Sequence, residues 1–157
     1  MDHSDKLPKH LLMGFALALG VYVAFFTCDQ HLRKRKGGWQ VDFSTNAAGW
    51  ARIDITQPTL KIREQIVFRG EAATNTGSVS FDRPGKPIPF GKVKFEDLTY
   101  LPGSVAFDFF GHEVELLPRT LYLNKREIPW TGAVHELKPD EKLPPGMSYE
   151  PKRRKRL

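Results

Sequence analysis

The feature that most constrains this chain is an uncharged apolar run near its N-terminus, from Leu11 to Cys28. As a helix, about 18 residues rise roughly 27 Å, close to the thickness of a bilayer's hydrocarbon core. Every face of that helix would be apolar, and Gly14 and Gly20 would weaken it in water. The run therefore predicts a retained transmembrane helix rather than a core helix of a soluble protein.

A cleaved secretory signal and a lipoprotein signal ending at Cys28 are the alternatives. Signal cleavage requires small residues just before the cut, whereas Phe25, Phe26 and Thr27 precede Cys28. The triplet ALA at 16–18 lies inside the run and leaves too short an apolar region before it. We expect retention of the helix, and both alternatives stay open.

Basic residues near the ends of the run bear on its orientation. Lys6 and Lys9 precede the run, and four basic residues follow it at 33–36. Because Lys and Arg resist translocation, this bias favours the C-terminal domain on the cytoplasmic side. A domain on the outer side is the alternative.

The net charge of +6 comes from two short runs. Between Gly37 and Leu137 there are eleven basic and twelve acidic residues, which nearly cancel. A folded domain with a basic nucleic-acid-binding face is therefore not indicated. The positive charge lies in the flanking residues Arg33, Lys34, Arg35, Lys36, Lys152, Arg153, Arg154, Lys155 and Arg156.

Both runs are candidate contacts for anionic lipid or phosphate, because clustered Lys and Arg release counterions when they bind phosphates. If the domain is cytoplasmic, acidic headgroups are nearer than nucleic acid, so we expect the lipid bilayer as a partner. A solvated tail is the simpler interpretation of the C-terminal run. A membrane-tethered nucleic-acid binder is a weaker alternative.

From Trp39 onward the apolar residues alternate with polar ones, as in half-buried strands. The segments 39–44 and 50–56, joined by turn residues, predict a hairpin. Gly and Pro separate further short candidate strands, and Asn124-Lys125 suits a tight turn. This pattern predicts an all-β sandwich or small barrel, with the later strands at 60–62, 65–69, 78–82, 92–95, 104–110, 112–117, 120–123 and 126–130.

Composition divides the chain into five segments. Gly37-Gly38 is expected to form a flexible joint, and the residues after Leu137 are too rich in Pro and charge to build a core. The expected segments are a polar N-terminal tail at 1–10, the anchor at 11–28, a basic juxtamembrane linker at 29–38, the all-β domain at 39–137, and a disordered Pro-rich basic tail at 138–157.

Glu113 and Glu115 are the candidates for catalysis. At alternate positions of a strand they share a face about 6.5–7 Å apart, the short end of the carboxylate separation in inverting glycosidases. The fragment EVELLP resembles the acidic strand motif of β-sandwich glucanases, but Pro118 leaves it without a third acidic residue. An exposed sheet face explains the alternation more simply.

The sequence contains no recognisable motif for binding a metal or a cofactor. Its single cysteine, Cys28, excludes an internal disulfide and a cysteine-based zinc site within one chain. The pairs His112-Glu113 and His135-Glu136 lack diagnostic ligand spacing. The chain also lacks a nucleophile elbow, a phosphate-binding loop and a zincin motif. We expect neither cofactor nor metal.

Aromatic residues suggest a binding role. Phe107 and Phe109 share one face of their expected strand, which leaves Phe110 on the other. We predict a single-pass membrane-anchored β domain without enzymatic activity. It is expected to serve protein interaction or assembly with another membrane or envelope protein through Phe110 and Trp130. An extracytoplasmic carbohydrate-binding or glycoside-cleaving domain is the alternative.

Overall fold

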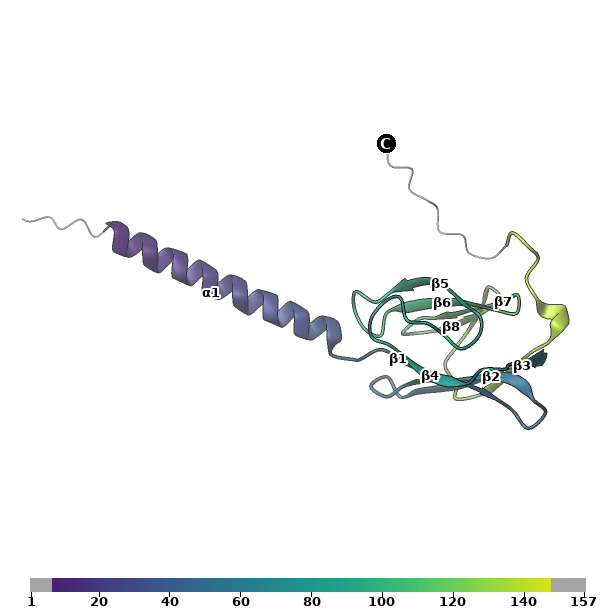
Figure 1. Ribbon diagram of the computed structural model, residues 1–157. Helices are drawn as coiled ribbons and strands as arrows, with labels where there is room; N and C mark the ends of the chain where they lie inside the picture. The colour runs from purple at the N-terminus through teal and green to yellow at the C-terminus, as the bar shows by residue number, and fades with distance from the viewer. Residues whose placement is uncertain (1–6, 148–157) are drawn as a thin grey trace, which may run out of the picture. The chain divides into compact units, whose positions relative to one another are not determined.

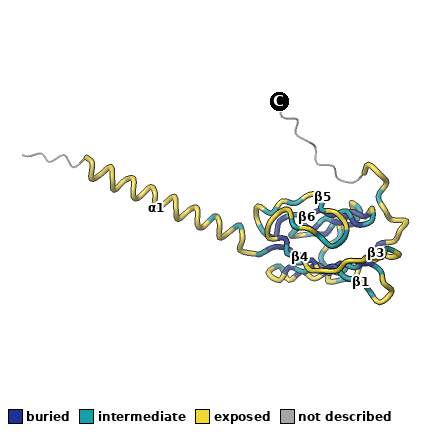
Figure 2. Tube along the Cα trace, viewed as in Figure 1, coloured by how far each residue is buried: buried dark blue, intermediate teal, exposed yellow. Residues whose placement is uncertain are grey.

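The computed structural model describes residues 7–147, and these divide into two compact units between Arg35 and Lys36. The first unit holds α1, Leu7–Lys34. No residue of α1 is buried, and Figure 2 shows it exposed along nearly its whole length. Its length, and a mean hydropathy of 2.2 over an 18-residue window, are those of a membrane-spanning anchor or a signal sequence.

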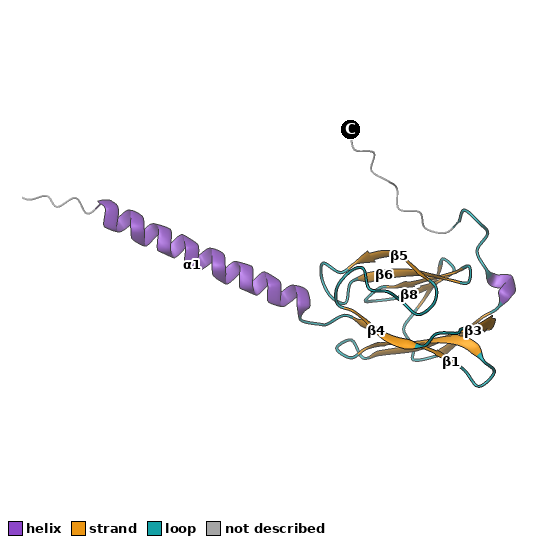
Figure 3. Cartoon of the chain, in the orientation of Figure 1, coloured by secondary structure: helices purple, strands orange, loops and turns teal. Residues whose placement is uncertain are grey.

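The second unit is a sandwich of two five-stranded sheets (Figure 1), which confirms the predicted all-β domain after a helix. The strand orders are β10-β3-β2-β1-β4 and β5-β6-β7-β8-β9. All pairs are antiparallel except β10 with β3. The strands, drawn in orange in Figure 3, are β1 (Trp39–Thr45), β2 (Trp50–Gln57), β3 (Ile62–Ala72), β4 (Gly77–Phe81), β5 (Lys92–Asp97), β6 (Ser104–Phe109), β7 (His112–Leu116), β8 (Leu121–Leu123), β9 (Arg126–Ile128) and β10 (Val134–Leu137).

The core lies between the two sheets and is rich in phenylalanine. The predicted alternation holds in β1, where Trp39, Val41 and Phe43 are all buried. Rings from opposite sheets meet edge to face or tilted, with Phe81 5.3 Å from Phe107 between centroids. Such aromatic pairs add to the stabilisation that their buried area provides.

The chain enters the sandwich through a joint that is bonded to the domain. The Gln57 side-chain amide donates to the carbonyl oxygens of Lys36 at 2.6 Å and Gly37 at 3.1 Å. Gly38 is buried, and a Cβ there would lie 2.2 Å from the carbonyl oxygen of Phe81. The glycine pair, expected as a flexible joint, therefore allows close packing under the end of β4.

The chain also continues past the last predicted strand. Residues 134–137 form β10, which pairs in parallel with β3. The buried Glu64 carboxylate fixes the preceding loop, since its Oε1 accepts from the backbone N–H groups of Thr131 and Gly132 at 2.5 and 2.8 Å. Beyond β10, a 3-10 helix spans Pro139–Glu141, and the Leu143 N–H donates to the Gly111 carbonyl at 3.0 Å. Residues 138–147, expected as part of a disordered tail, thus carry contacts to the sandwich.

Candidate functional site

The two glutamates singled out in the sequence lie on the outer face of the second sheet. Val114 and Leu116 of β7 point into the core, so Glu113 and Glu115 occupy the opposite face. Asp108 of β6 is the cross-strand partner of Glu113. The outer face therefore gathers carboxylates from two neighbouring strands.

A lysine from the next turn completes this cluster. Asn124 and Lys125 have positive φ angles of 49° and 68°, as the predicted two-residue hairpin turn requires. The turn brings the Lys125 Nζ into contact with Glu113 Oε1 and within 3.8 Å of Glu115 Oε1. Asn124 Oδ1 accepts from the Glu113 backbone N–H at 3.0 Å and anchors the turn to β7.

The two glutamates differ in their exposure. The Glu115 side chain is 30% exposed, whereas Glu113 is only 2% exposed. Glu113 lines a hollow together with Leu143, Pro144 and Pro145, so the segment after β10 covers this part of the sheet. The exposed face that alternation predicts is thus found in part at Glu115 and not at Glu113.

The electrostatics of the pair also differ from those of isolated carboxylates. Burial raises the pKa of Glu115, and a hydrogen bond and the negative charge of Glu113 raise it further, while Lys125 acts in the opposite direction. Two adjacent carboxyl groups that share a hydrogen bond favour retention of one proton. Glu115 can therefore act as a hydrogen-bond donor at a higher pH than an ordinary glutamate.

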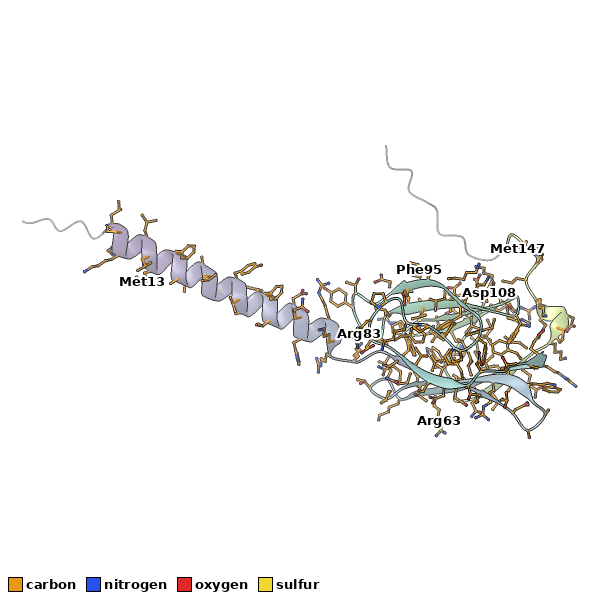
Figure 4. The ribbon with its side chains drawn as sticks, in the orientation of Figure 1. Met13, Arg63, Arg83, Phe95, Asp108 and Met147 are labelled. Carbon is orange, nitrogen blue, oxygen red and sulfur yellow. The ribbon has the colours of Figure 1, made fainter. Side chains whose placement is uncertain are left out.

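A pocket of about 170 Å³ adjoins Glu115. Along one row of the sheet Ala106 pairs with Phe95 on one side and with Glu115 on the other, and its small side chain leaves the hollow between them. A bulge in β5 between Val93 and Phe95 sets this register. Figure 4 shows Phe95 and Asp108 on the outer side of the second sheet. The pocket is lined by Phe95, Ser104, Val105, Ala106, Glu115, Leu116 and Leu117.

The two aromatics predicted as partner contacts pack partly against the core. Phe110 adopts a φ of 56° and lies 5.7 Å from the Phe68 ring. Trp130 lies 5.4 Å from Trp39, and its Nε1 donates to the Leu117 carbonyl at 3.1 Å. Their role in partner binding stays a prediction. Phe95 is more exposed than Phe110 or Trp130, at 39%. Its position depends on a bulge that alternation does not reveal.

The two histidine–glutamate pairs are separate. His112 is buried, its Nδ1 lies 3.1 Å from Asn124 Nδ2, and burial lowers its pKa. The His135 Nε2 instead lies 3.3 Å from Glu64 Oε2. Among residues 7–147, no group of three or more His, Cys, Asp or Glu side chains could hold a metal ion.

The juxtamembrane basic run begins within α1. Arg33 Nε lies 2.7 Å from Asp29 Oδ2, one helical turn earlier, and Lys34 is the last residue of the helix. Positive charge at this position is favourable to the helix dipole. Lys36 is exposed and already belongs to the second unit. The C-terminal run Lys152–Arg156 lies outside the described residues.

No protein-family model, curated protein or solved structure matches this chain. Within the described residues, the pocket beside Phe95 and the basic residues in the last turn of α1 and just after it are the features suited to binding a partner or a surface.

Proposed function

We propose that this chain is a single-pass membrane protein whose β sandwich is a non-enzymatic module for protein interaction or assembly. A candidate membrane-spanning helix supports the anchor. The observation that carries the interaction role is the pocket between Phe95 and Glu115 on the outer face of the second sheet. The partner we expect is another membrane or envelope protein that presents an apolar side chain.

The pocket has the size and chemistry of a binding site for one side chain. Its volume of about 170 Å³ is close to that of the cavity of roughly 150 Å³ that accepts benzene in an engineered protein. Phe95 offers an apolar wall, while Ser104 and Glu115 offer hydrogen-bonding groups beside it. Interfaces draw most of their binding energy from a few side chains inserted in such pockets.

The glutamate pair favours binding over cleavage. A catalytic carboxylate must reach the substrate or a water molecule, yet Glu113 is 2% exposed and contacts the Lys125 ammonium. This arrangement supports a structural role for Glu113, with Glu115 as the group available to a partner. The carbohydrate-directed alternative gains no support from a carboxylate that is covered in this way.

Photo-crosslinking from position 95 tests this proposal. A photoreactive phenylalanine analogue replaces Phe95 in the full-length protein in its native membranes, and the crosslinked species are identified by mass spectrometry. Ala106→Leu fills the pocket, whereas the control Ser78→Leu adds the same side chain on the outer face of the first sheet, where Ser78 pairs with Asp42. We expect one discrete protein adduct that Ala106→Leu abolishes and Ser78→Leu preserves. An adduct unaffected by Ala106→Leu would contradict the pocket's role.

A further inference from the structure

Several turns of the sandwich gather around the point where the chain enters it. Thr59 Oγ1 donates to the Lys36 carbonyl at 2.9 Å, and Trp39 Nε1 donates to the Gly103 carbonyl at 3.1 Å. Trp39 also pairs with Phe81, the last residue of β4, and its ring contacts the tilted ring of Trp130, which is bonded to Leu117. We call this surface the entry end, and it comprises residues 36–39, 58–61, 82–87, 98–103 and 117–120.

Three turns of the entry end each carry an exposed basic residue: Lys61, Arg83 and Arg119. None of the three belongs to an ion pair within the described part of the chain. They come from both sheets, because the turn at 58–61 joins β2 to β3 and the turn at 117–120 joins β7 to β8. Figure 4 shows Arg83 and Met147 at opposite ends of the sandwich.

The acidic residues in the entry end and beside it, Asp82 and the β5 residues Glu96 and Asp97, are bound by groups of its loops. Asp82 contacts the Lys86 ammonium, which lowers the pKa of the Asp82 carboxyl. Glu96 Oε1 accepts from the Gly85 N–H at 2.6 Å. Asp97 accepts from the Thr99 N–H at 3.1 Å, and this bond holds the pKa of Asp97 below its usual value. These carboxylates stabilise the turns, while the three basic side chains extend into solvent.

An exposed tyrosine lies in another turn of the entry end. Tyr100, in the turn between β5 and β6, is 56% exposed. A tyrosine ring combines an apolar body with a polar hydroxyl, and tyrosine is enriched where membrane proteins meet the headgroup region. The entry end therefore combines positive charge with an aromatic suited to a bilayer surface.

Very few residues separate the end of α1 from the entry end. One residue, Arg35, lies between Lys34, where α1 ends, and Lys36, whose carbonyl is bonded to Gln57 and Thr59. One extended residue spans at most about 3.6 Å. A helix that spans the bilayer would thus deliver the entry end to the membrane surface.

We propose that the entry end docks onto acidic lipid headgroups through Lys61, Arg83 and Arg119, with Tyr100 in the headgroup layer. This inference rests on the proposed membrane anchor and adds a second membrane contact that belongs to the sandwich itself. Near an acidic leaflet each basic residue contributes roughly fivefold to affinity. Headgroups with a net negative charge are the ligands, and salt weakens the contact because it screens exposed charges.

Hydrogen exchange of the full-length protein in lipid nanodiscs tests this proposal. One set of nanodiscs contains phosphatidylcholine alone, and the other contains 30% phosphatidylglycerol. In the acidic nanodiscs we expect amides of the turns at 58–61, 98–103 and 117–120 to exchange several-fold more slowly. The turns at 46–49 and 73–76, at the opposite end of β1 and β3, should be unchanged.

Charge variants separate this contact from simple anchoring. The triple variant Lys61→Gln, Arg83→Gln and Arg119→Gln should lose the lipid-dependent protection. The matched control Lys92→Gln, Arg126→Gln and Lys138→Gln removes equal charge from exposed residues outside the entry end and should keep it. Equal exchange in the two lipids, or protection that persists in the triple variant, would overturn the docking proposal. Failure of the protein to insert in nanodiscs would instead overturn the anchor.

Discussion

The side-chain amide of Gln57 donates to the carbonyl oxygen of Lys36 at a distance of 2.6 Å, and so ties the end of β2 to the residue that follows the juxtamembrane Arg35. Gln57 is fully buried, and its Oε1 accepts from the Leu60 N–H at 2.9 Å. The Gln57 side chain thereby forms hydrogen bonds with the backbone both before β1 and in the β2–β3 turn.

Replacing this side chain should loosen the joint and destabilise the sandwich. We expect Gln57→Ala to lower the free energy of unfolding by about 2 kcal/mol, because the three hydrogen bonds of this buried side chain to backbone groups are lost. Gln57→Glu keeps the acceptor for Leu60 but loses both donors, so it tests the donor bonds separately. Urea unfolding monitored by tryptophan fluorescence measures both variants. Wild-type stability in Gln57→Ala would contradict the role assigned to these bonds.

Position 38, just before β1, should not accept a side chain without a loss of stability. A Cβ at Gly38 would meet the Phe81 carbonyl at 2.2 Å, so Gly38→Ala must displace backbone. We expect a loss of about 1–3 kcal/mol, the usual cost of overpacking. Gly49→Ala is a comparison at a position with open space but a φ of +79°, where the cost is backbone strain alone. If Gly38→Ala costs less than Gly49→Ala, the close packing at Phe81 is not important.

His112 should make stability depend on pH. Because burial lowers the pKa of His112 from its ordinary value of 6.5, the unfolded chain binds this proton at a higher pH than the folded chain. Stability contributed by neutral His112 is therefore lost as the pH falls below about 6.5. Unfolding experiments between pH 7.5 and 5.5 should show this loss in the wild type and a flatter profile in His112→Gln. His135→Gln should retain the slope that His112 causes.

Glu115 should produce the opposite slope at lower pH. Its pKa is raised above 4.5 in the folded state, so the folded chain holds the proton to a higher pH than the unfolded chain. Stability accordingly falls as the pH rises from 4.5 through the folded pKa. Glu115→Gln should remove this dependence. A profile unchanged by Glu115→Gln would show that the glutamates do not share a proton.

Substitution of Glu113 should lower stability, because Glu113 is the buried partner of Lys125. Glu113→Gln removes the charge that faces the ammonium, and we expect a loss of about 1–3 kcal/mol. Neither glutamine variant should alter glycan binding or release of reducing sugar. Loss of such an activity in correctly folded Glu113→Gln would revive the glycoside-cleaving alternative.

Substitution of Trp130 should lower the stability of the sandwich. Trp130→Phe removes the bond to the Leu117 carbonyl and should cost about 1 kcal/mol, whereas Trp130→Ala should cost about 3 kcal/mol through lost packing against Trp39. Thermal unfolding measures both. If Trp130→Phe instead abolishes a partner contact without loss of stability, the sequence-based role of Trp130 in binding is supported.

Local sequence patterns were sufficient for the hairpin of β1 and β2 and for the turn at Asn124-Lys125, because alternation and positive-φ chemistry act over a few residues. They were insufficient for β10, whose parallel partner β3 is distant in sequence and whose four residues include one buried side chain, Leu137. Parallel pairing requires a long connection.

The candidate site was predictable only in the part that depends on local sequence pattern. Alternation placed Glu113 and Glu115 on one face of a strand. The burial of Glu113 depends on Lys125 and on residues 143–145, and the pocket depends on the bulge that sets Phe95 beside Ala106. Both are results of tertiary packing, which a local pattern does not encode.

The apolar helix α1 should be retained in the mature protein as a membrane anchor for the sandwich. The most direct measurement is alkaline extraction of native membranes, followed by intact-mass analysis of the protein in each fraction. We predict that the chain stays in the membrane pellet with a mass that includes residues 11–28 and no lipid at Cys28. Release of a shortened chain into the supernatant, or a lipid-modified chain that begins at Cys28, would contradict it.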